Sequence, residues 1–170
     1  MRLLYRTRQF FGGLSAHVSD ADLRQADRYL PPAAQTWFRS LPRDLQWHGL
    51  QVMADLQLSG VDRSEVLAAA LLHDAGKAAT WSGPVPRALA VLLRKLAPGW
   101  TARRSQRDWR SSRGLDRLVA VAAQHPQIAA EQAERYGCNP VTVELIRCHQ
   151  DYTQTDDPML TLFQQVDDRH

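Results

Sequence analysis

The sequence predicts an all-α protein, a compact bundle of helices in a single domain. Apolar residues recur at three- and four-residue spacing nearly everywhere, which is the period of a helix that is buried on one side. No run alternates at period two for long enough to indicate a β-strand. A chain of 170 residues has the length of one domain and can bury a core without covalent or metal cross-links.

Residues 1–42 are expected to form a helical extension in front of the core. Residues 1–13 mix arginines with aromatic and aliphatic side chains, and their apolar run is too broken for a signal peptide. We expect an amphipathic helix packed on the domain there, rather than one that contacts a membrane. Another helix starts at Ser19 or Asp20, and the pair Pro31-Pro32 ends it and opens the next one.

Proline and glycine divide the rest of the domain, residues 43–168, into further helices. Pro42 precedes a long helix that Ser59-Gly60 ends. We expect a later helix to stop at His125, because a proline disfavours helical geometry for the residue before it, and Pro126 then starts a separate helix. The expected helices cover about residues 43–58, 66–75, 87–96, 115–124, 126–136, 140–149 and 158–167.

The helix that ends in His73-Asp74 has the most distinctive composition. Its sequence, Val-Leu-Ala-Ala-Ala-Leu-Leu before the doublet, is apolar on every side, so this helix can lie only inside the protein. A buried ionised carboxylate costs several kcal/mol unless it is paired, so Asp74 needs a cation. His73 offers a neutral nitrogen beside it, and such a pair suits a divalent transition metal.

Both ends of this helix carry capping signals. Asp62 and Glu65 stand at N-cap spacing before it, and Gly76 can adopt the left-handed conformation that ends a helix. Lys77 follows directly.

Six polar side chains occupy core-facing or junction positions on different helices: His48, His73, Asp74, His125, His149 and Asp167. A single histidine on an apolar stripe is more often a hydrogen-bonded core residue than a metal ligand. Six such groups in one small domain are harder to explain in that way, because each one left unpaired would cost about 1–3 kcal/mol. A shared metal cluster would satisfy them together.

Positive charge is concentrated in residues 99–114, which hold five arginines against Asp108 alone. Trp100 and Trp109 flank these arginines, as a platform for phosphates and bases requires. We nevertheless expect a solvated, mobile loop here rather than a nucleic-acid interface. The formal net charge of +3 therefore gives little support for a nucleic-acid partner.

Cysteine usage predicts a reduced, cytoplasmic protein. Cys138 and Cys148 are the two cysteines, and their spacing matches neither a zinc knuckle nor a redox pair. No transmembrane segment is visible in the sequence.

His48, the His73-Asp74 doublet and Asp167 resemble the H…HD…D signature of the HD superfamily of metal-dependent phosphohydrolases. The resemblance covers about residues 43–168, and the segment Leu-Leu-His-Asp-x-Gly-Lys is its specific part. It implies a helical HD-domain-like bundle in which these four side chains hold one metal ion. Asp168 is a rival for the last ligand, and we prefer Asp167 because it continues the apolar stripe of the final helix.

The same resemblance extends to a second metal ion. His125 and His149 resemble two additional histidines of subfamilies in which the aspartate of the doublet, here Asp74, bridges two ions. It therefore implies one or two divalent ions, chosen from Mn, Fe, Co, Zn, Ni and Mg. Gln150 stands where the cyclic-dinucleotide phosphodiesterase branch has a second histidine, and its Gly-Tyr-Pro segment is missing, so that branch is disfavoured. Segments typical of the guanosine tetraphosphate hydrolases are also missing.

The implied reaction is hydrolysis of a phosphate ester, of a nucleotide or a related small molecule, by a metal-activated water. Asp74 would act in catalysis as a metal ligand. Lys77 either contacts a non-bridging phosphoryl oxygen or is a surface lysine at a favourable helix end. The expected partner is an anionic phosphorylated small molecule, and we do not expect the protein to bind a membrane.

Two other classes of protein stay open. One is a diiron oxygenase, which colour and an iron requirement would identify. The other is a non-catalytic binding or regulatory domain, which would contain metal yet turn over no phosphate ester.

Overall fold

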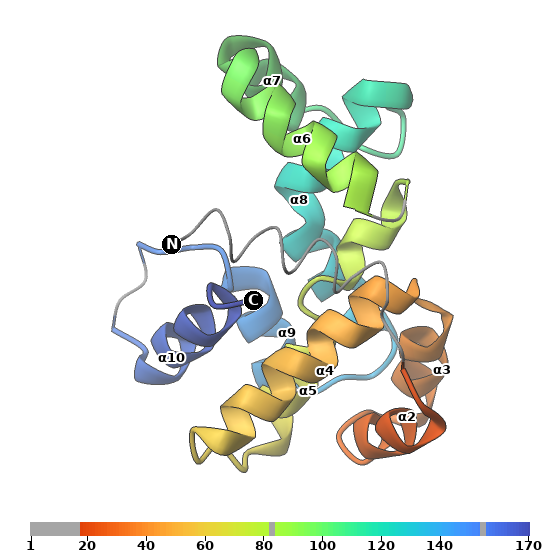
Figure 1. Ribbon diagram of the computed structural model, residues 1–170, viewed down its shortest axis with the longest axis vertical. Coiled ribbons are helices and arrows are strands. Elements are labelled where there is room, and N and C mark those ends of the chain that lie inside the picture. The colour runs from red at the N-terminus through yellow and green to blue at the C-terminus, as the bar shows by residue number, and fades with distance from the viewer. Residues whose placement is uncertain (1–17, 82–83, 154–155) are drawn as a thin grey trace.

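The computed structural model describes residues 18–81, 84–153 and 156–170, and every regular element in these ranges is a helix (Figure 1). The predicted all-α class is therefore confirmed. The amphipathic helix expected over residues 1–13 lies outside the described residues. None of the helices in these three ranges combines the length and the apolar composition that crossing a bilayer requires. In chain order the elements are α2 (Asp20–Asp27), α3 (Pro32–Ser40), α4 (Arg43–Leu58), α5 (Ser64–Leu72), the 3₁₀ helix η1 (Ala75–Ala79), α6 (Pro84–Leu96), α7 (Pro98–Ser105), α8 (Gly114–Arg135), α9 (Pro140–Cys148) and α10 (Pro158–Asp167).

The two helices before residue 43 share the core of the rest of the chain. Ser19 caps α2, because its hydroxyl accepts a hydrogen bond from the backbone N–H of Asp22 at 3.2 Å. In return, the carboxylate of Asp22 accepts from the backbone N–H of Ser19 at 2.9 Å. Leu23 of α2 and Phe38 of α3 are buried in the cluster of apolar side chains that α4, α5, α9 and α10 also enter. The predicted extension is thus packed into the main core.

α5 is the central helix of this core. Residues 66–72 are all buried, and α4 and α9 pack against them. α4 crosses α5 at Gly49, where a Cβ atom would lie 2.6 Å from the carbonyl oxygen of Leu71. Any side chain at this position would push the two helices apart, so glycine permits the close crossing.

The ends of α5 differ from the prediction. Asp62 and Glu65 do not cap it, since Arg63 occupies the N-cap position without a side-chain hydrogen bond. Glu65 instead accepts from the guanidinium of Arg63 at 2.9 Å. Gly76 does not adopt a positive φ, because the chain runs from α5 directly into η1. Its missing side chain serves packing, since a Cβ atom there would collide with the carbonyl oxygen of His125 in α8.

α8 is one continuous helix with Pro126 inside it, so the predicted break at His125 is wrong. Proline has no N–H, and it cannot donate to the carbonyl oxygen of Ala122 four residues before it. Nδ1 of His125 lies 3.0 Å from that oxygen and donates in its place. The helix therefore passes through the proline with this carbonyl satisfied.

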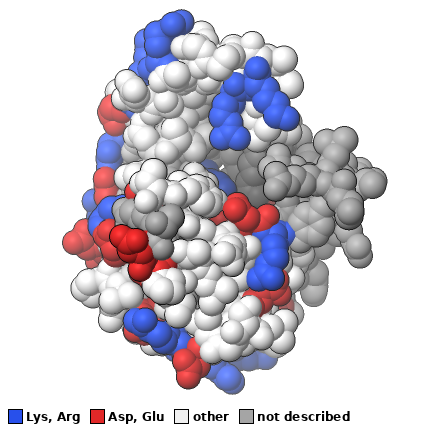
Figure 2. Space-filling model, turned by 90° about the vertical axis from the view of Figure 1, so that its left-hand side faces the viewer, with Lys and Arg blue, Asp and Glu red and all other residues white. Residues whose placement is uncertain are grey.

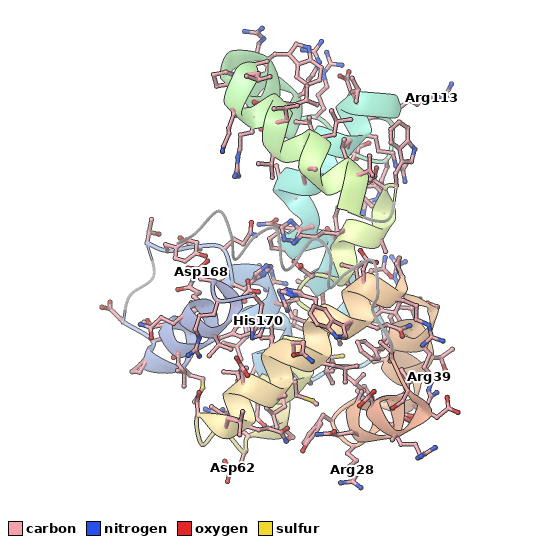
Figure 3. All side chains as sticks on the ribbon, in the orientation of Figure 1. Arg28, Arg39, Asp62, Arg113, Asp168 and His170 are labelled. Carbon is pink, nitrogen blue, oxygen red and sulfur yellow. The ribbon has the colours of Figure 1, made fainter. Side chains whose placement is uncertain are left out.

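α6, α7 and the first half of α8, residues 84–121, project from the helical body and are called the upper lobe below (Figure 1). Basic side chains lie at two places on the upper part of the molecule, with uncharged surface between them (Figure 2). Arg113, at the start of α8, points away from the lobe (Figure 3). Residues 98–105 of this lobe are helical, so the loop predicted over 99–114 is wrong in its first half.

Ion pairs tie this arginine-rich segment to α8. Arg104 and Arg107 donate to the carboxylate of Asp116 at 2.6 and 2.8 Å. Arg110 donates to Glu131 at 2.7 Å. The loop predicted from composition is therefore a helix and a turn that are anchored to α8, although the segment is largely exposed, as predicted. Local charge could not reveal this, because the carboxylate partners of these arginines lie beyond the segment.

Candidate metal centre

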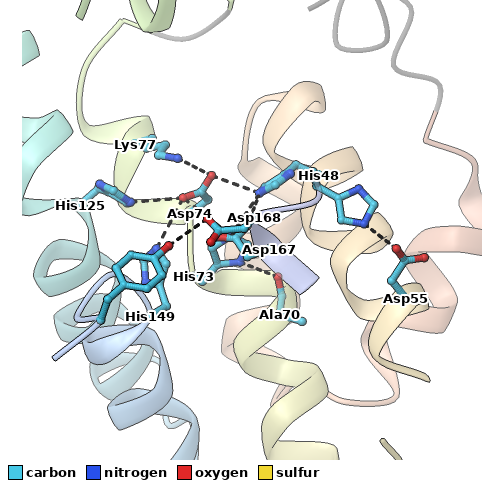
Figure 4. Close-up of polar contacts among 12 residues, drawn as sticks. His48, Asp55, Ala70, His73, Asp74, Lys77, His125, His149, Asp167 and Asp168 are labelled. Carbon is cyan, nitrogen blue, oxygen red and sulfur yellow. Dashed lines mark hydrogen bonds and ion pairs between the residues drawn. The ribbon is translucent and has the colours of Figure 1, made fainter. Parts of the chain in front are cut away.

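Helices that are far apart in the sequence bring six polar side chains to one place (Figure 4). One histidine comes from α4, one from α8 and one from the end of α9. The histidine and aspartate of the doublet follow α5, and the second aspartate ends α10. These are the six residues that the sequence singled out: His48, His73, Asp74, His125, His149 and Asp167.

Three of these side chains form a compact triangle of ligand atoms. Nε2 of His48, Nε2 of His73 and Oδ1 of Asp167 lie 3.2 Å from one another. Ligands that bind one ion at about 2.1 Å lie about 3.0–3.4 Å apart in octahedral or tetrahedral geometry. Oδ2 of Asp74 adds a fourth atom, 3.4 Å from Nε2 of His48. This spacing fits a single divalent ion.

The two carboxylate oxygens of Asp74 face two different groups of imidazoles. Oδ2 faces His48, whereas Oδ1 lies 3.3 Å from Nε2 of His125 and 3.9 Å from Nε2 of His149. Asp74, His125 and His149 have the mutual spacing of metal ligands in their own right. The carboxylate therefore lies between two possible ion positions.

Backbone carbonyls fix the orientation of three of the imidazole rings. Nδ1 of His73 lies 2.9 Å from the carbonyl oxygen of Ala70, and Nδ1 of His149 lies 2.7 Å from that of Ile146. His125 makes the same contact with a carbonyl three residues before it. A carbonyl only accepts, so each Nδ1 must carry the proton and each Nε2 a lone pair. This is the usual second contact of a metal-binding histidine.

Two of these lone pairs have no hydrogen-bonding partner. Nε2 of His125 and Nε2 of His149 are buried, and neither makes a hydrogen bond in the described part of the chain. A buried polar atom without a partner costs about 1–3 kcal/mol. A divalent metal ion would satisfy both atoms, so the residues present fit this group.

Burial keeps most of the imidazoles uncharged. It lowers the pKa of His48 and of His125 below the usual value, and it lowers the pKa of His149 to about 3. At His73 burial acts in the same direction, but the carboxylates of Asp167 and Asp74 outweigh it and raise the pKa. A ring that is neutral at physiological pH can offer its lone pair to a metal.

The two aspartates are ionised. Burial alone would raise their pKa values, but the ammonium of Lys77 and the ring of His73 hold the pKa of Asp74 well below its usual range. His73 and a hydrogen bond from His48 lower the pKa of Asp167 in the same way. Two carboxylates in a buried site require positive charge nearby, which is the charge that a divalent ion carries.

Asp167, rather than Asp168, belongs to the cluster. Asp167 contacts His48 and His73, whereas Asp168 is exposed and accepts a hydrogen bond from the hydroxyl of Tyr152 at 3.0 Å. The two carboxylates point to different surroundings because successive residues of a helix lie about 100° apart around its axis. The sequence-based preference for Asp167 agrees with this geometry.

Lys77 lies at the edge of the cluster, in η1. Its Nζ donates to Oδ2 of Asp74 at 2.5 Å, and the side chain is 29% exposed. Both predicted roles, contact with a phosphoryl oxygen and a favourable helix-end charge, are compatible with this position. The ion pair shows that the ammonium reaches the carboxylate that the histidines surround.

A cavity of about 1000 Å³ opens above the cluster, between the helical body and the upper lobe. Four of the six side chains line it: His48, Asp74, His125 and Asp167. His73 and His149 are fully buried behind them. Among the described residues, the cluster is therefore accessible from the side of this cavity, through which a small molecule can reach the ligands.

His170 is a further residue of this cavity, and the sequence did not single it out. Its Nε2 donates to the carboxylate of Asp55 at 2.8 Å, and its ring centroid lies 6.4 Å from that of His48. It follows Asp167 by three residues in the turn after α10, and its backbone N–H donates to the carbonyl oxygen of Asp167 at 2.9 Å. That spacing is the signal that could have identified it.

Comparison of the chain with protein-family models, with curated proteins and with solved structures gives no match in any of the three. The arguments that follow therefore rest on the residues and their geometry.

Proposed function

We propose that this protein is a metal-dependent phosphohydrolase, which cleaves a phosphate ester of a nucleotide or a related small molecule. One observation carries the proposal: four histidines and two aspartates from five parts of the chain meet at the base of an accessible cavity, and two of the buried imidazole nitrogens make no hydrogen bond with any described residue. The resemblance of the same residues to the HD signature supports it.

In this proposal the six residues hold the metal. His48, His73, Asp74 and Asp167 would hold one ion, and His125 and His149 would hold a second one that shares the carboxylate of Asp74. When bound, a divalent ion supplies an activated water at neutral pH and offsets the negative charge of the phosphoryl oxygens. The Nδ1 contacts with backbone carbonyls keep the histidines aligned, so little reorganisation is needed for the reaction.

Lys77 has a separate role in binding the substrate. Its Nζ can leave Oδ2 of Asp74 and donate to a non-bridging oxygen of a phosphate in the cavity, because the side chain is partly exposed and flexible. This contact would hold the ester beside the ligands and stabilise the charge of its phosphoryl group. Asp74 would keep its contacts with the histidines when the ammonium of Lys77 moves to the phosphate.

An activity screen tests the proposal. The purified protein would be loaded in turn with Mn, Fe, Co, Zn, Ni or Mg and offered mononucleotides, dinucleotides and generic phosphate esters. We expect phosphate release with at least one ion, and none from Asp74→Ala under the same conditions. Bound metal without turnover of any ester would instead support a binding or regulatory protein. An iron-dependent colour together with oxygen consumption would support a diiron oxygenase.

A further inference from the structure

The cavity continues from the metal centre onto an apolar wall in the upper lobe. α6 contributes Val91 and Leu92, and α8 contributes Leu118 and Val119, while Trp81 lies just before α6. Leu92 is 50% exposed, Trp81 58% and Val91 39%. Large apolar side chains that are exposed inside a cavity, next to groups that bind metal, indicate contact with a ligand.

Two hydroxyl groups of α7 that line the cavity already donate to backbone carbonyls. The hydroxyl of Thr101 donates to the carbonyl oxygen of Pro98 at 2.9 Å, and that of Ser105 donates to the carbonyl oxygen of Ala102 at 2.9 Å. A ribose or a nucleobase placed against the side chains of Val91 and Leu92 would therefore lose hydrogen bonds to water without replacement from these apolar groups. An alkyl or aryl group makes no hydrogen bonds to water and therefore loses none when it contacts this wall.

Positive charge lies at the end of the cavity where the phosphate would bind. Lys77 lines the cavity beside the carboxylate of Asp74, and the metal ligands lie directly beneath. The cavity thus has a polar, charged end at the cluster and an apolar stretch of wall at Val91 and Leu92, and the basic residues Arg94 and Lys95 at the end of α6 also line it. Its volume of about 1000 Å³ leaves room for a molecule considerably larger than phosphate itself.

We propose that the substrates of this site are phosphate esters of apolar alcohols, either alkyl or aryl, whose phosphate lies at the metal centre while the apolar group covers the α6 wall. This proposal rests on the proposed function for the reaction itself. It replaces a nucleotide by an amphiphilic small molecule as the preferred substrate. The preference for an apolar alcohol over a nucleoside follows from the apolar side chains of the wall and not from the metal ligands.

A homologous series of n-alkyl phosphates, from ethyl to octyl phosphate, tests the proposal. We expect kcat/KM to rise about twofold to fourfold for each added methylene until the wall is covered. Binding of the matching alkylphosphonates, which cannot be hydrolysed at a phosphate ester, would be measured by calorimetry in parallel. Octylphosphonate should then bind at least tenfold more tightly than ethylphosphonate, and AMP should be a poorer substrate than octyl phosphate.

Two variants connect the effect to the wall. Leu92→Asp places a charge on the lining and should lower the octyl-to-ethyl ratio of kcat/KM at least tenfold. Leu115→Asp is the matched control, because Leu115 is 41% exposed in the same lobe but does not line the cavity. Both side chains are exposed, so neither variant should impair folding, and circular dichroism would verify this.

The two proposals fail in different ways. If esters are hydrolysed but chain length has no effect, the function stands and the apolar substrate is wrong. If no ester is hydrolysed but octylphosphonate binds and Leu92→Asp weakens it, the wall is a ligand site and the function is wrong. If octylphosphonate does not bind and Leu92→Asp instead lowers the melting temperature, the wall is covered by another part of the protein, and the substrate class is refuted.

Discussion

Nδ1 of His125 lies 3.0 Å from the carbonyl oxygen of Ala122, which is the helical acceptor that Pro126 leaves without a donor. The contact serves two purposes at once. It satisfies a buried carbonyl at the proline, and it fixes the tautomer that points Nε2 of His125 into the cluster. The proline that the sequence marks as a helix break is thus part of what orients a candidate ligand.

Asp74→Ala should remove bound metal, because Asp74 contacts ligands of both possible ion positions. We expect metal content, measured by elemental analysis after dialysis, to fall at least tenfold and any esterase activity to disappear. Asp168→Ala is the matched control and should leave both nearly unchanged, since Asp168 is exposed and contacts Tyr152. Full metal content in Asp74→Ala would show that the doublet is not a ligand.

The number of ions depends on His125 and His149. If both are ligands, the wild-type protein should contain about two divalent ions per chain, and His149→Gln should contain about one. Elemental analysis together with protein quantification gives this ratio. A wild-type value near one would exclude His125 and His149 from the ligand set, while leaving the triangle of His48, His73 and Asp167 in place.

Gly76→Ala should destabilise the protein by about 1–3 kcal/mol, because its Cβ atom would meet the backbone of His125 and lie 2.9 Å from the backbone nitrogen of Ala129. Gly99→Ala is the control, since no described atom lies within 4 Å of a Cβ atom there. It should be neutral or stabilise by up to about 1 kcal/mol. Urea denaturation measures both changes. Equal effects of the two substitutions would refute the close approach of η1 to α8.

The pH dependence of stability should reveal the buried imidazole of His149. Burial lowers its pKa from 6.5 to about 3 in the folded protein. Between these two values the unfolded chain binds a proton that the folded chain does not, so the free energy of unfolding rises with pH. In EDTA, we expect the wild-type protein to lose more stability between pH 7 and about pH 4.5 than His149→Gln does. Thermal denaturation at several pH values measures this, and parallel curves would contradict it.

The composition of the candidate site could be predicted because each residue carries a local signal. His48 continues an apolar stripe of α4, and the doublet ends a helix with no polar face. His149 and Asp167 end helices whose starts are marked by Asn139-Pro140 and Asp157-Pro158. These signals give the face of a helix on which a side chain lies. They give no distance between two helices.

The sequence-based predictions were wrong where a residue contacts a partner from another part of the chain, which a rule based on neighbouring residues does not include. Pro126 did not break α8, because His125 replaced the missing donor. Gly76 did not form a left-handed cap, because its function is contact with α8. The segment after residue 99 is not a loop throughout, because residues 98–105 form α7, and Asp116 and Glu131 bind three of its five arginines.

The sequence by itself determined that this chain is helical, where most helices begin, and that the six polar side chains of the candidate site face inward, because periodicity and capping act within a few residues. Only the tertiary structure decided that three ligand atoms lie 3.2 Å apart, that Asp74 lies between two groups of imidazoles, and that an apolar wall faces the same cavity. These features depend on how helices from distant parts of the chain pack, and packing is set by the shapes of all the buried side chains together.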